Sequence, residues 1–269
     1  MKDPEKCDAC GSSDLTEPRA YQLMMGLSVG ATADGAINAY LRPETATTTY
    51  TNFKNVLDST PHKLPFGIVQ IGKAFRNEIS PRGFVFRMRE FEQAEMQYFV
   101  NPKMDEKYFE EWKKNRMAWW IEVLGIPANK LRFTPHEKLA HYAKAAVDIE
   151  YEFPDGFDEV EGIHNRQDFD LGSHTKAQNE FKINAKTIEN KDSTTKLSYS
   201  DPQAGENFIP YVIETAMGVN RCMFAVMLQA YTDEDLGEGK SRTVLKLKPA
   251  LAPVKAAVIP LARNVPELV

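Results

Sequence analysis

Arginine, glutamate and phenylalanine residues recur along the segment "AFRNEISPRGFVFRMREFEQAE", which runs from Ala74 to Glu95. Guanidinium groups suit phosphate oxygens because they offer paired N–H donors, and a phenylalanine ring offers a purine a surface for stacking. Carboxylates bind an ammonium group directly or bind phosphates through Mg²⁺. These residue types in one segment therefore indicate a site for a polyphosphate nucleotide together with a small cationic group.

The elements that carry this segment must bring its charges to one surface. Successive side chains of a strand point to opposite faces, and we expect an antiparallel hairpin from Gly67 to Val100 with its turn at "SPRG". The residues that would share one face are Arg76, Glu78, Arg87, Arg89, Phe91, Gln93 and Glu95. A solvated sheet face with cross-strand ion pairs would give the same pattern, so charge alone leaves both interpretations open.

A second charged segment, "VDIEYEFPDGFDEVEGI", has seven acidic residues and no basic one between Asp148 and Glu161. It predicts a strand, a turn and a strand, with Glu159 and Glu161 on one face. Further along, "FIPYVIETAMGVNRCMFAVMLQAY" predicts a strand, a glycine turn and a helix. That strand would present Glu214 and Ala216 on one face, with Arg221 at the start of the helix.

Two further helices are expected between these segments. The first opens at Asn101-Pro102 and runs to about Leu124, with an apolar stripe that we assign to the core. The second would begin at Thr134, which is followed by a proline and a capping-box glutamate, and would end near Ala146.

The composition bounds the class of protein. The chain has 269 residues with 42% hydrophobic and 10% aromatic content, enough for a substantial core. Its net charge of −5 argues against binding nucleic acid through overall charge. No apolar run approaches the roughly 20 residues of a membrane span, and the start "MKDPEKCDAC" lacks the apolar centre of a signal peptide. We expect a soluble, cytoplasmic protein with no membrane partner.

The block "YLRPETATTTYTNFKNVLDSTPHKLPFGIVQIGKAFRNEISPRGFVFRMREFEQAE" resembles the catalytic domain of the dimeric-type glycyl-tRNA synthetases, which are class II aminoacyl-tRNA ligases. Within it "RNEISPR…FRMREFEQAE" resembles motif 2 of that family, and "VIETAMGVNR" resembles motif 3. The resemblance covers nearly the whole chain. It implies an α+β fold with the class II aminoacyl-tRNA synthetase-like antiparallel sheet, of six or seven strands, flanked by helices.

The resemblance also implies which residues bind ATP. Arg76 would hold the α-phosphate and the amino-acid carboxylate, Arg221 would pair with the γ-phosphate, and both would be catalytic. Phe91 would stack on the adenine, with Glu78 near its amino group. The other implied ATP-binding residues are Asn77, Arg87, Met88, Glu159 and Val160, with Glu159 as a partner of Mg²⁺.

The amino-acid site follows from the same resemblance. Glu44, Glu95 and Glu214 match the carboxylates that surround the ammonium of glycine. Ala216 stands where the family has a serine, and Thr47-Thr48-Thr49 stands where the family has Gln-Gly, so glycine selectivity is expected to be looser. The implied activity is an ATP-dependent ligase of glycine-tRNA ligase type. It would form glycyl-adenylate from ATP, Mg²⁺ and glycine.

Three parts of the sequence depart from the family. Residues 1–20 resemble a zinc knuckle but supply only Cys7 and Cys10, so we expect a remnant half-site rather than bound zinc. We expect residues 21–248 to form the catalytic domain, and residues 249–269 resemble the start of a truncated anticodon-binding unit. Motif 1, which builds the family's dimer, is missing, so the oligomeric state is not implied. Charging of glycine tRNA is expected to be weak or absent.

Two other interpretations stay open. A catalytically silent paralogue, acting as a nucleotide- or nucleic-acid-binding accessory protein, would explain the missing motif 1 and anticodon domain. The retained ATP motifs favour the enzyme instead, because an accessory protein has no need of them. The chain would also fit a piece of a longer protein.

Overall fold

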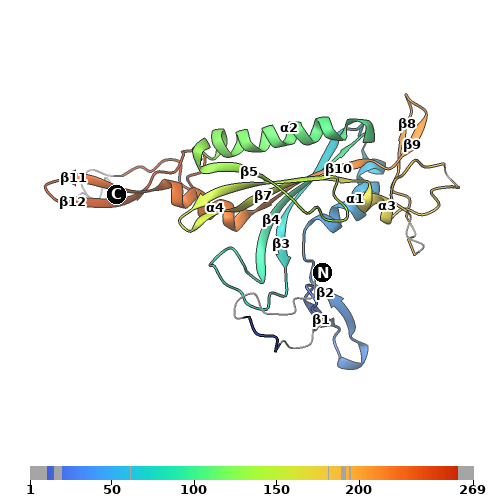
Figure 1. Cartoon of the computed structure of the whole chain (residues 1–269), viewed down its shortest axis with the longest axis horizontal. Helices are drawn as coiled ribbons and strands as arrows, with labels where there is room; N and C mark the ends of the chain where they lie inside the picture. The colour runs from blue at the N-terminus through green and yellow to red at the C-terminus, as the bar shows by residue number, and fades with distance from the viewer. Residues whose placement is uncertain are drawn as a thin grey trace.

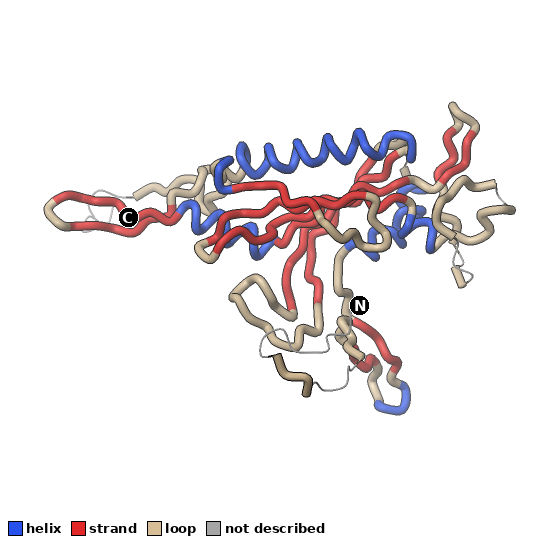
Figure 2. The backbone as a smooth tube through the Cα atoms, viewed as in Figure 1, coloured by secondary structure: helices blue, strands red, loops and turns tan. Residues whose placement is uncertain are grey.

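A single six-stranded antiparallel sheet organises the chain (Figure 1, Figure 2). The computed structural model describes residues 11–14, 20–60, 62–180, 182–188, 192–193 and 195–259. The strand order is β3-β4-β10-β7-β6-β5, and every neighbouring pair is antiparallel. The strands are β3 (Phe66–Phe75), β4 (Glu90–Val100), β5 (Leu131–Pro135), β6 (Ala145–Phe153), β7 (Gly156–Gln167) and β10 (Tyr211–Gly218). The expected α+β class with an antiparallel sheet is confirmed.

Helices cover both faces of this sheet. Figure 1 shows α2 along one face, and α4 contributes Cys222 and Ala225 to the same buried cluster as Phe109 of α2. Helix α1 packs with Phe99 and Val212 in a second cluster on the other face. The α-helices are α1 (Ala46–Ser59), α2 (Asp105–Ala118), α3 (Phe169–Ser173) and α4 (Val219–Ala230). The short 3₁₀ helices are η1 (Ala33–Gly35), η2 (Pro102–Met104) and η4 (Ala128–Lys130), and η3 (Trp119–Val123) is a π-helical turn.

Three two-stranded hairpins project from this body. Figure 1 shows the pair β11–β12 extending from one end of the molecule and the pair β8–β9 at the other end. The hairpin strands are β1 (Gly26–Val29), β2 (Ile37–Tyr40), β8 (Tyr199–Asp201), β9 (Glu206–Phe208), β11 (Tyr231–Gly237) and β12 (Lys240–Leu245). The assignment of residues 249–269 to an anticodon-binding unit stays a prediction, and residues 260–269 lie outside the described part.

The helix expected from Asn101 to about Leu124 is confirmed as the continuous run η2, α2 and η3. The Asn101 side chain accepts a hydrogen bond from the main-chain N–H of Lys103 at 2.9 Å, which caps the first turn. The run ends before Gly125, whose φ of +81° favours glycine.

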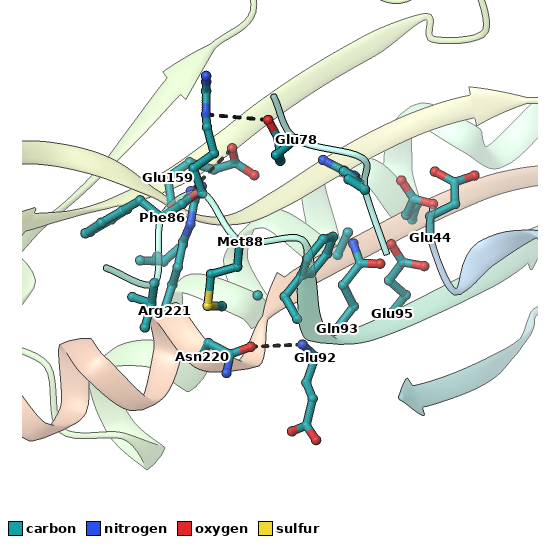
Figure 3. Close-up of a pocket in the computed structure, with 18 of the residues that line it drawn as sticks. Glu44, Glu78, Phe86, Met88, Glu92, Gln93, Glu95, Glu159, Asn220 and Arg221 are labelled. Atoms are coloured by element: carbon teal, nitrogen blue, oxygen red, sulfur yellow. Dashed lines mark hydrogen bonds and ion pairs between the residues drawn. The ribbon is translucent and has the colours of Figure 1, made fainter. Parts of the chain in front are cut away.

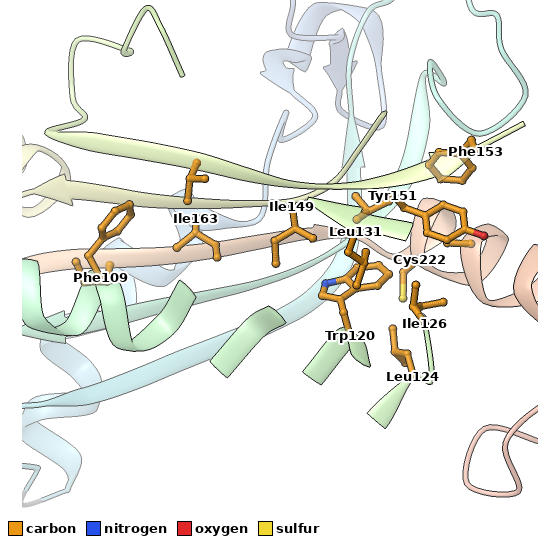
Figure 4. Packing of buried hydrophobic residues seen from close by; sticks show 14 of the residues in the cluster. Phe109, Trp120, Leu124, Ile126, Leu131, Ile149, Tyr151, Phe153, Ile163 and Cys222 are labelled. Carbon is orange, nitrogen blue, oxygen red and sulfur yellow. The ribbon is translucent and has the colours of Figure 1, made fainter. Parts of the chain in front are cut away.

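The apolar stripe of this helix packs on the sheet (Figure 4). Trp120 is fully buried and lies in one cluster with Ile149 and Ile163 from β6 and β7. Each such buried side chain contributes on the order of 1.5–3 kcal/mol. Cys222 of α4 joins the same cluster, and burial raises the pKa of its thiol to about 12, as expected for a core cysteine.

The prediction of a helix from Thr134 to about Ala146 is wrong. Residues Leu131–Pro135 form the edge strand β5, and residues 136–144 form a loop. Pairing with β6 satisfies the main chain of this segment and buries Leu131, so the tertiary pairing outweighs the local capping signals. Pro135 is tolerated because it ends an edge strand.

The hairpin from Gly67 to Val100, which carries the arginines, also differs from the expected one. The first strand ends at Phe75 and the second begins at Glu90, so residues 76–89 form a long loop rather than a tight turn. Phe84 within this loop has a φ of +55°. The loop therefore lets Arg76 and Arg87 leave the strict alternation of a strand.

The expected common face of Glu159 and Glu161 is wrong as well. A bulge in the β6–β7 pairing sets Glu159 opposite Glu150 and Glu161 opposite Ile149. The extra residue, Val160, reverses the alternation at this point. Glu161 is consequently buried on the α2 side, where Arg116 donates to it at 2.5 Å.

Candidate active site

A pocket of about 230 Å³ lies on the sheet face opposite α2 (Figure 3). Strand alternation explains its position, because Ile163 and Ile213 point into the core under α2 while His164 and Glu214 point the other way. Of the residues predicted from the sequence, the pocket is lined by Glu44, Arg76, Glu78, Arg87, Met88, Phe91, Glu95, Glu159, Val160, Glu214, Ala216 and Arg221. Asn77 points elsewhere, and its side chain donates to the carbonyl of Gln22 at 3.2 Å.

One end of the pocket, here called the carboxylate end, is formed by Glu44, Glu95, Arg166 and Glu214. Glu95 on β4 is paired with Ala216 on β10, and Glu44 comes from the segment before α1; Figure 3 shows Glu44 and Glu95 near each other. Glu95 and Glu214 are 4% and 3% exposed. Burying carboxylates is costly unless each finds a partner, so the donors around them decide what this end binds.

Arg166 is the main partner of Glu214 and was not predicted. Its Nη1 donates to Glu214 Oε2 at 3.0 Å, and its Nε donates to Asp170 at 2.8 Å. The Tyr142 ring lies 4.1 Å from its guanidinium carbon. A lone arginine two residues after His164, directly beyond the acidic run, was the sequence signal for it.

Glu214 has two further contacts. Gln97 donates to it at 2.7 Å, and His164 Nδ1 lies 3.2 Å from its other oxygen. Burial would raise the pKa of Glu214, but Arg166 and His164 hold it down at about 2. Burial would lower the pKa of His164, and Glu214 raises it instead.

The pKa of Glu95 is shifted in the opposite direction from that of Glu214. Burial and the neighbouring Glu214 raise its pKa to about 7, although Thr45 donates a hydrogen bond to it. Burial also raises the pKa of Glu44. The carboxylate end therefore has more buried carboxylate than Arg166 neutralises, and it favours a cationic ligand.

The other end, here called the arginine end, is formed by Glu78, Arg87, Glu159 and Arg221. Figure 3 shows Glu159 and Arg221 grouped there, away from Glu44. Arg221 donates to the main-chain carbonyls of Glu159 at 2.6 Å and Phe86 at 2.9 Å. Arg87 and Glu78 form only a loose ion pair at 3.9 Å. The Arg87 side chain is about half exposed and that of Arg221 about one quarter exposed, so both can be reached by a phosphate from solvent.

Arg76 and Phe91 come from the two strand ends at the pocket. The guanidinium carbon of Arg76 lies 5.3 Å from the centre of the Phe91 ring, and its Nε donates to the carbonyl of Pro43 at 3.2 Å. Val160 lines the pocket although its side chain is 1% exposed and belongs to the core cluster.

Some of the charged residues do form the ordinary cross-strand pairs. Arg132 of β5 donates to Glu150 of β6 at 2.6 Å, and Lys130 pairs with Glu152. The interpretation as a solvated face with cross-strand ion pairs is therefore right for the edge of the sheet at β5 and β6. The arginines near β4 instead line the pocket.

A family model described as "tRNA synthetase class II core domain (G, H, P, S and T)" matches residues 31–230. The chain belongs to this family. Two relatives named glycine–tRNA ligase are those of Thermus thermophilus, 55% identical over 256 residues, and Deinococcus radiodurans, 52% identical over 258 residues. Each alignment covers 95% of this chain and 51% of the relative. The class II core described here thus spans about half the length of those relatives.

A solved structure supports the fold of this class II core. The prolyl-tRNA synthetase of Giardia lamblia, in complex with prolyl-adenylate, matches with a TM-score of 0.54 at 18% identity. The match covers 76% of this chain and 37% of that one. Within the described residues, no helix has the length and apolar character needed to cross a membrane.

The sequence predicts a partner residue for Mg²⁺ and a remnant half-site for zinc. Glu159 is about half exposed at its side chain and makes only a long ion pair with Arg221 at 3.8 Å, and its carboxylate is the oxygen ligand type that Mg²⁺ prefers. Cys7 and Cys10, the expected zinc half-site, lie outside the described residues.

Proposed function

We propose that this chain binds ATP with Mg²⁺ and activates glycine as glycyl-adenylate, in the manner of the catalytic core of a glycine–tRNA ligase. The proposal rests on one observation, which is that a single pocket has arginines at one end and buried carboxylates at the other. Its arginine end suits a polyphosphate, and its carboxylate end suits an ammonium group. Relatives about half identical to this chain and named glycine–tRNA ligase support the choice of amino acid.

In the proposed step, a carboxylate oxygen of glycine forms a bond to the α-phosphorus of ATP. The bond from that phosphorus to the oxygen bridging to the β-phosphate breaks, and pyrophosphate leaves with the electron pair. The nucleophile is already ionised at neutral pH, so the step needs no general base. Positioning and neutralisation of charge are what this chain must supply.

Each group in the pocket has a role in this proposal. Arg76 neutralises the α-phosphate and orients the glycine carboxylate, Arg221 binds the γ-phosphate, and Phe91 stacks on adenine. Mg²⁺, when bound, neutralises developing charge on the phosphates, and Glu159 would hold it. The ammonium of glycine would lie among Glu44, Glu95 and Glu214.

Selectivity for glycine over alanine and serine is expected to be looser than in the family. Ala216 lines the pocket without the hydroxyl of a serine, and the Thr48 hydroxyl, in the first turn of α1, accepts a hydrogen bond from the Gln70 side-chain amide at 2.5 Å. One methyl group in a pocket changes discrimination by roughly 1–3 kcal/mol. We therefore expect glycine to be preferred, with measurable activation of alanine and serine.

ATP–pyrophosphate exchange with each of the twenty amino acids tests the proposal. The strongest exchange should come with glycine, and weaker exchange with alanine and serine. Exchange with glycine alone would contradict the looser selectivity. No exchange with any amino acid, while ATP still binds, would favour a non-catalytic nucleotide-binding paralogue.

Charging of glycine tRNA by this chain is expected to be weak or absent. The net charge is −5, and binding of nucleic acid through a few arginines is strongly reduced by salt. A filter-binding assay at physiological ionic strength should detect little glycine tRNA retained. Tight binding that resists salt would contradict this expectation.

A further inference from the structure

Three side chains beside the pocket form a cluster with the composition of a transition-metal site. A ring nitrogen of His136, a ring nitrogen of His164 and a carboxylate oxygen of Asp148 all lie within 4.8 Å of one another. His136 Nε2 is 2.8 Å from Asp148 Oδ2, and the two imidazole rings are edge to face with their centres 5.8 Å apart. His136 follows β5, whereas Asp148 and His164 lie on β6 and β7.

Hydrogen bonding within the described residues does not account for this arrangement. His136 Nε2 and His164 Nδ1 are buried, and neither makes a hydrogen bond of good geometry to a described residue, although carboxylate oxygens lie 2.8 and 3.2 Å away. Buried polar atoms of folded proteins nearly always have a partner. A cation bound between the imidazoles and Asp148 would give His136 Nε2 one.

The two nitrogens of His164 face different partners. Nδ1 is on the side of Glu214, at 3.2 Å. A Cβ at position 162 would lie 3.3 Å from His164 Nε2 and 3.4 Å from Asp148 Oδ1, so both atoms flank the open side of Gly162. Histidines that bind metal commonly have a carboxylate next to the other ring nitrogen, which fixes the ring. Glu214 occupies that position here.

Space for an ion and its water is present at the cluster. A cavity of about 280 Å³ is lined by His136 and His164 together with Tyr142 and Ala146. Two imidazoles and one carboxylate, with water as a fourth ligand, suit zinc-class ions far better than Mg²⁺, which prefers oxygen ligands.

We propose that His136, Asp148 and His164 bind one divalent transition-metal ion of the zinc class. The ligand atoms of a tetrahedral zinc site are about 3.3 Å apart, so the present spread must close slightly on binding. His136 begins the loop 136–144 and is the ligand best able to move.

Metal binding would connect this loop to the carboxylate end of the pocket. The same loop carries Tyr142, whose ring lies 4.1 Å from the guanidinium carbon of Arg166. The ion would tie the loop to β6 and β7, and it would hold the His164 ring beside Glu214. A bound ion would thereby restrain Tyr142 and His164, two side chains that border the proposed ammonium site.

Titration with Co²⁺, followed by its visible d–d absorption, tests the site without relying on activity. The whole chain is used with Cys7→Ser and Cys10→Ser, because thiolates would bind the same ions. We expect about one Co²⁺ per chain with a tetrahedral spectrum. His136→Ala and Asp148→Asn should each weaken binding about tenfold or more. Asp148→Asn keeps the side-chain shape, and circular dichroism checks that both variants are folded.

His141→Ala is the matched control, because His141 is in the same loop but packs against Phe169, with ring centres 4.8 Å apart. It should bind Co²⁺ like the parent. Hydrogen exchange of residues 136–144 should slow when Zn²⁺ is added to the parent and not when it is added to His136→Ala. A parent that binds no Co²⁺, or a His136→Ala variant that binds it equally well, would overturn the proposal.

Discussion

At the carboxylate end of the pocket, charged side chains from neighbouring strands contact one another directly, whereas at the arginine end they bond mainly to main-chain carbonyls. Arg166 and Glu214 are each less than 5% exposed and form a closed pair. Arg221 is about one quarter exposed at its side chain and donates to two carbonyl groups. The first arrangement is part of the folded core, and the second can exchange its partners.

This difference suits two kinds of ligand. A buried pair that is already formed provides a fixed outline for a small ligand, and its surplus carboxylates provide the attraction. An arginine bonded to a carbonyl loses little by turning to a phosphate, because the bond to an anion is the stronger one. Charge at the carboxylate end should therefore matter most for stability, and charge at the arginine end should matter most for ATP binding.

Arg166→Met should produce the largest effect on stability. It leaves Glu214 buried without its main partner, and breaking a buried pair in this way costs about 3–5 kcal/mol. Urea unfolding at pH 8 measures the loss. The matched control is Arg87→Met at the arginine end, where the ion pair is exposed and its loss should cost at most about 1 kcal/mol. Equal losses in the two variants would remove the distinction between the ends.

Glu95→Gln should change how stability depends on pH. The pKa of Glu95 is raised from 4.5 to about 7 in the folded chain, so the folded state binds more protons between these values. The stability that this group confers is complete below pH 4.5 and is lost as pH rises through 7. From pH 4.5 to above pH 7, the free energy of unfolding of the wild type should fall by up to roughly 3 kcal/mol relative to that of the variant.

Urea unfolding of both proteins from pH 4.5 to 8.5 checks this expectation. Glu214 has the opposite sign, since its pKa of about 2 confers stability above pH 4.5 that is lost as pH falls through 2. Parallel curves for wild type and Glu95→Gln would show that Glu95 ionises normally. Such a result would mean that the carboxylates at the carboxylate end are neutralised more completely than the contacts of Arg166 indicate.

Arg76→Ala should have a smaller effect, expressed in ligand binding. It removes a charge-assisted phosphate contact of about 1.5–3 kcal/mol, which corresponds to roughly ten- to a hundredfold in ATP affinity. Calorimetry with ATP and Mg²⁺ measures this change. Arg132→Ala, which removes an arginine paired with Glu150 on the acidic hairpin, is the control and should bind ATP normally. Equal affinity of wild type and Arg76→Ala would contradict the assignment of the nucleotide site.

Motif and strand patterns were enough to identify most of the pocket. Phe91 and Glu95 on β4, and Glu214 and Ala216 on β10, share the pocket because alternation holds along both strands. The helix from Asn101 to Leu124 was predicted from its cap and stripe, since both signals are local. Arg76 and Arg221 were found through the motif resemblance, which the family assignment supports.

Long-range contacts decided what these local patterns could not. Pairing with β6 made Leu131–Pro135 a strand despite its helix-capping residues, and one bulge sent Glu161 to the face opposite Glu159. The Arg166–Glu214 pair joins two strands 48 positions apart, and no spacing rule predicts it. Residue types and alternation are local properties of the chain, so the sequence by itself determined most of the residues that face the pocket. Which buried charges meet there depends on strand order and register, and only the tertiary structure decided it.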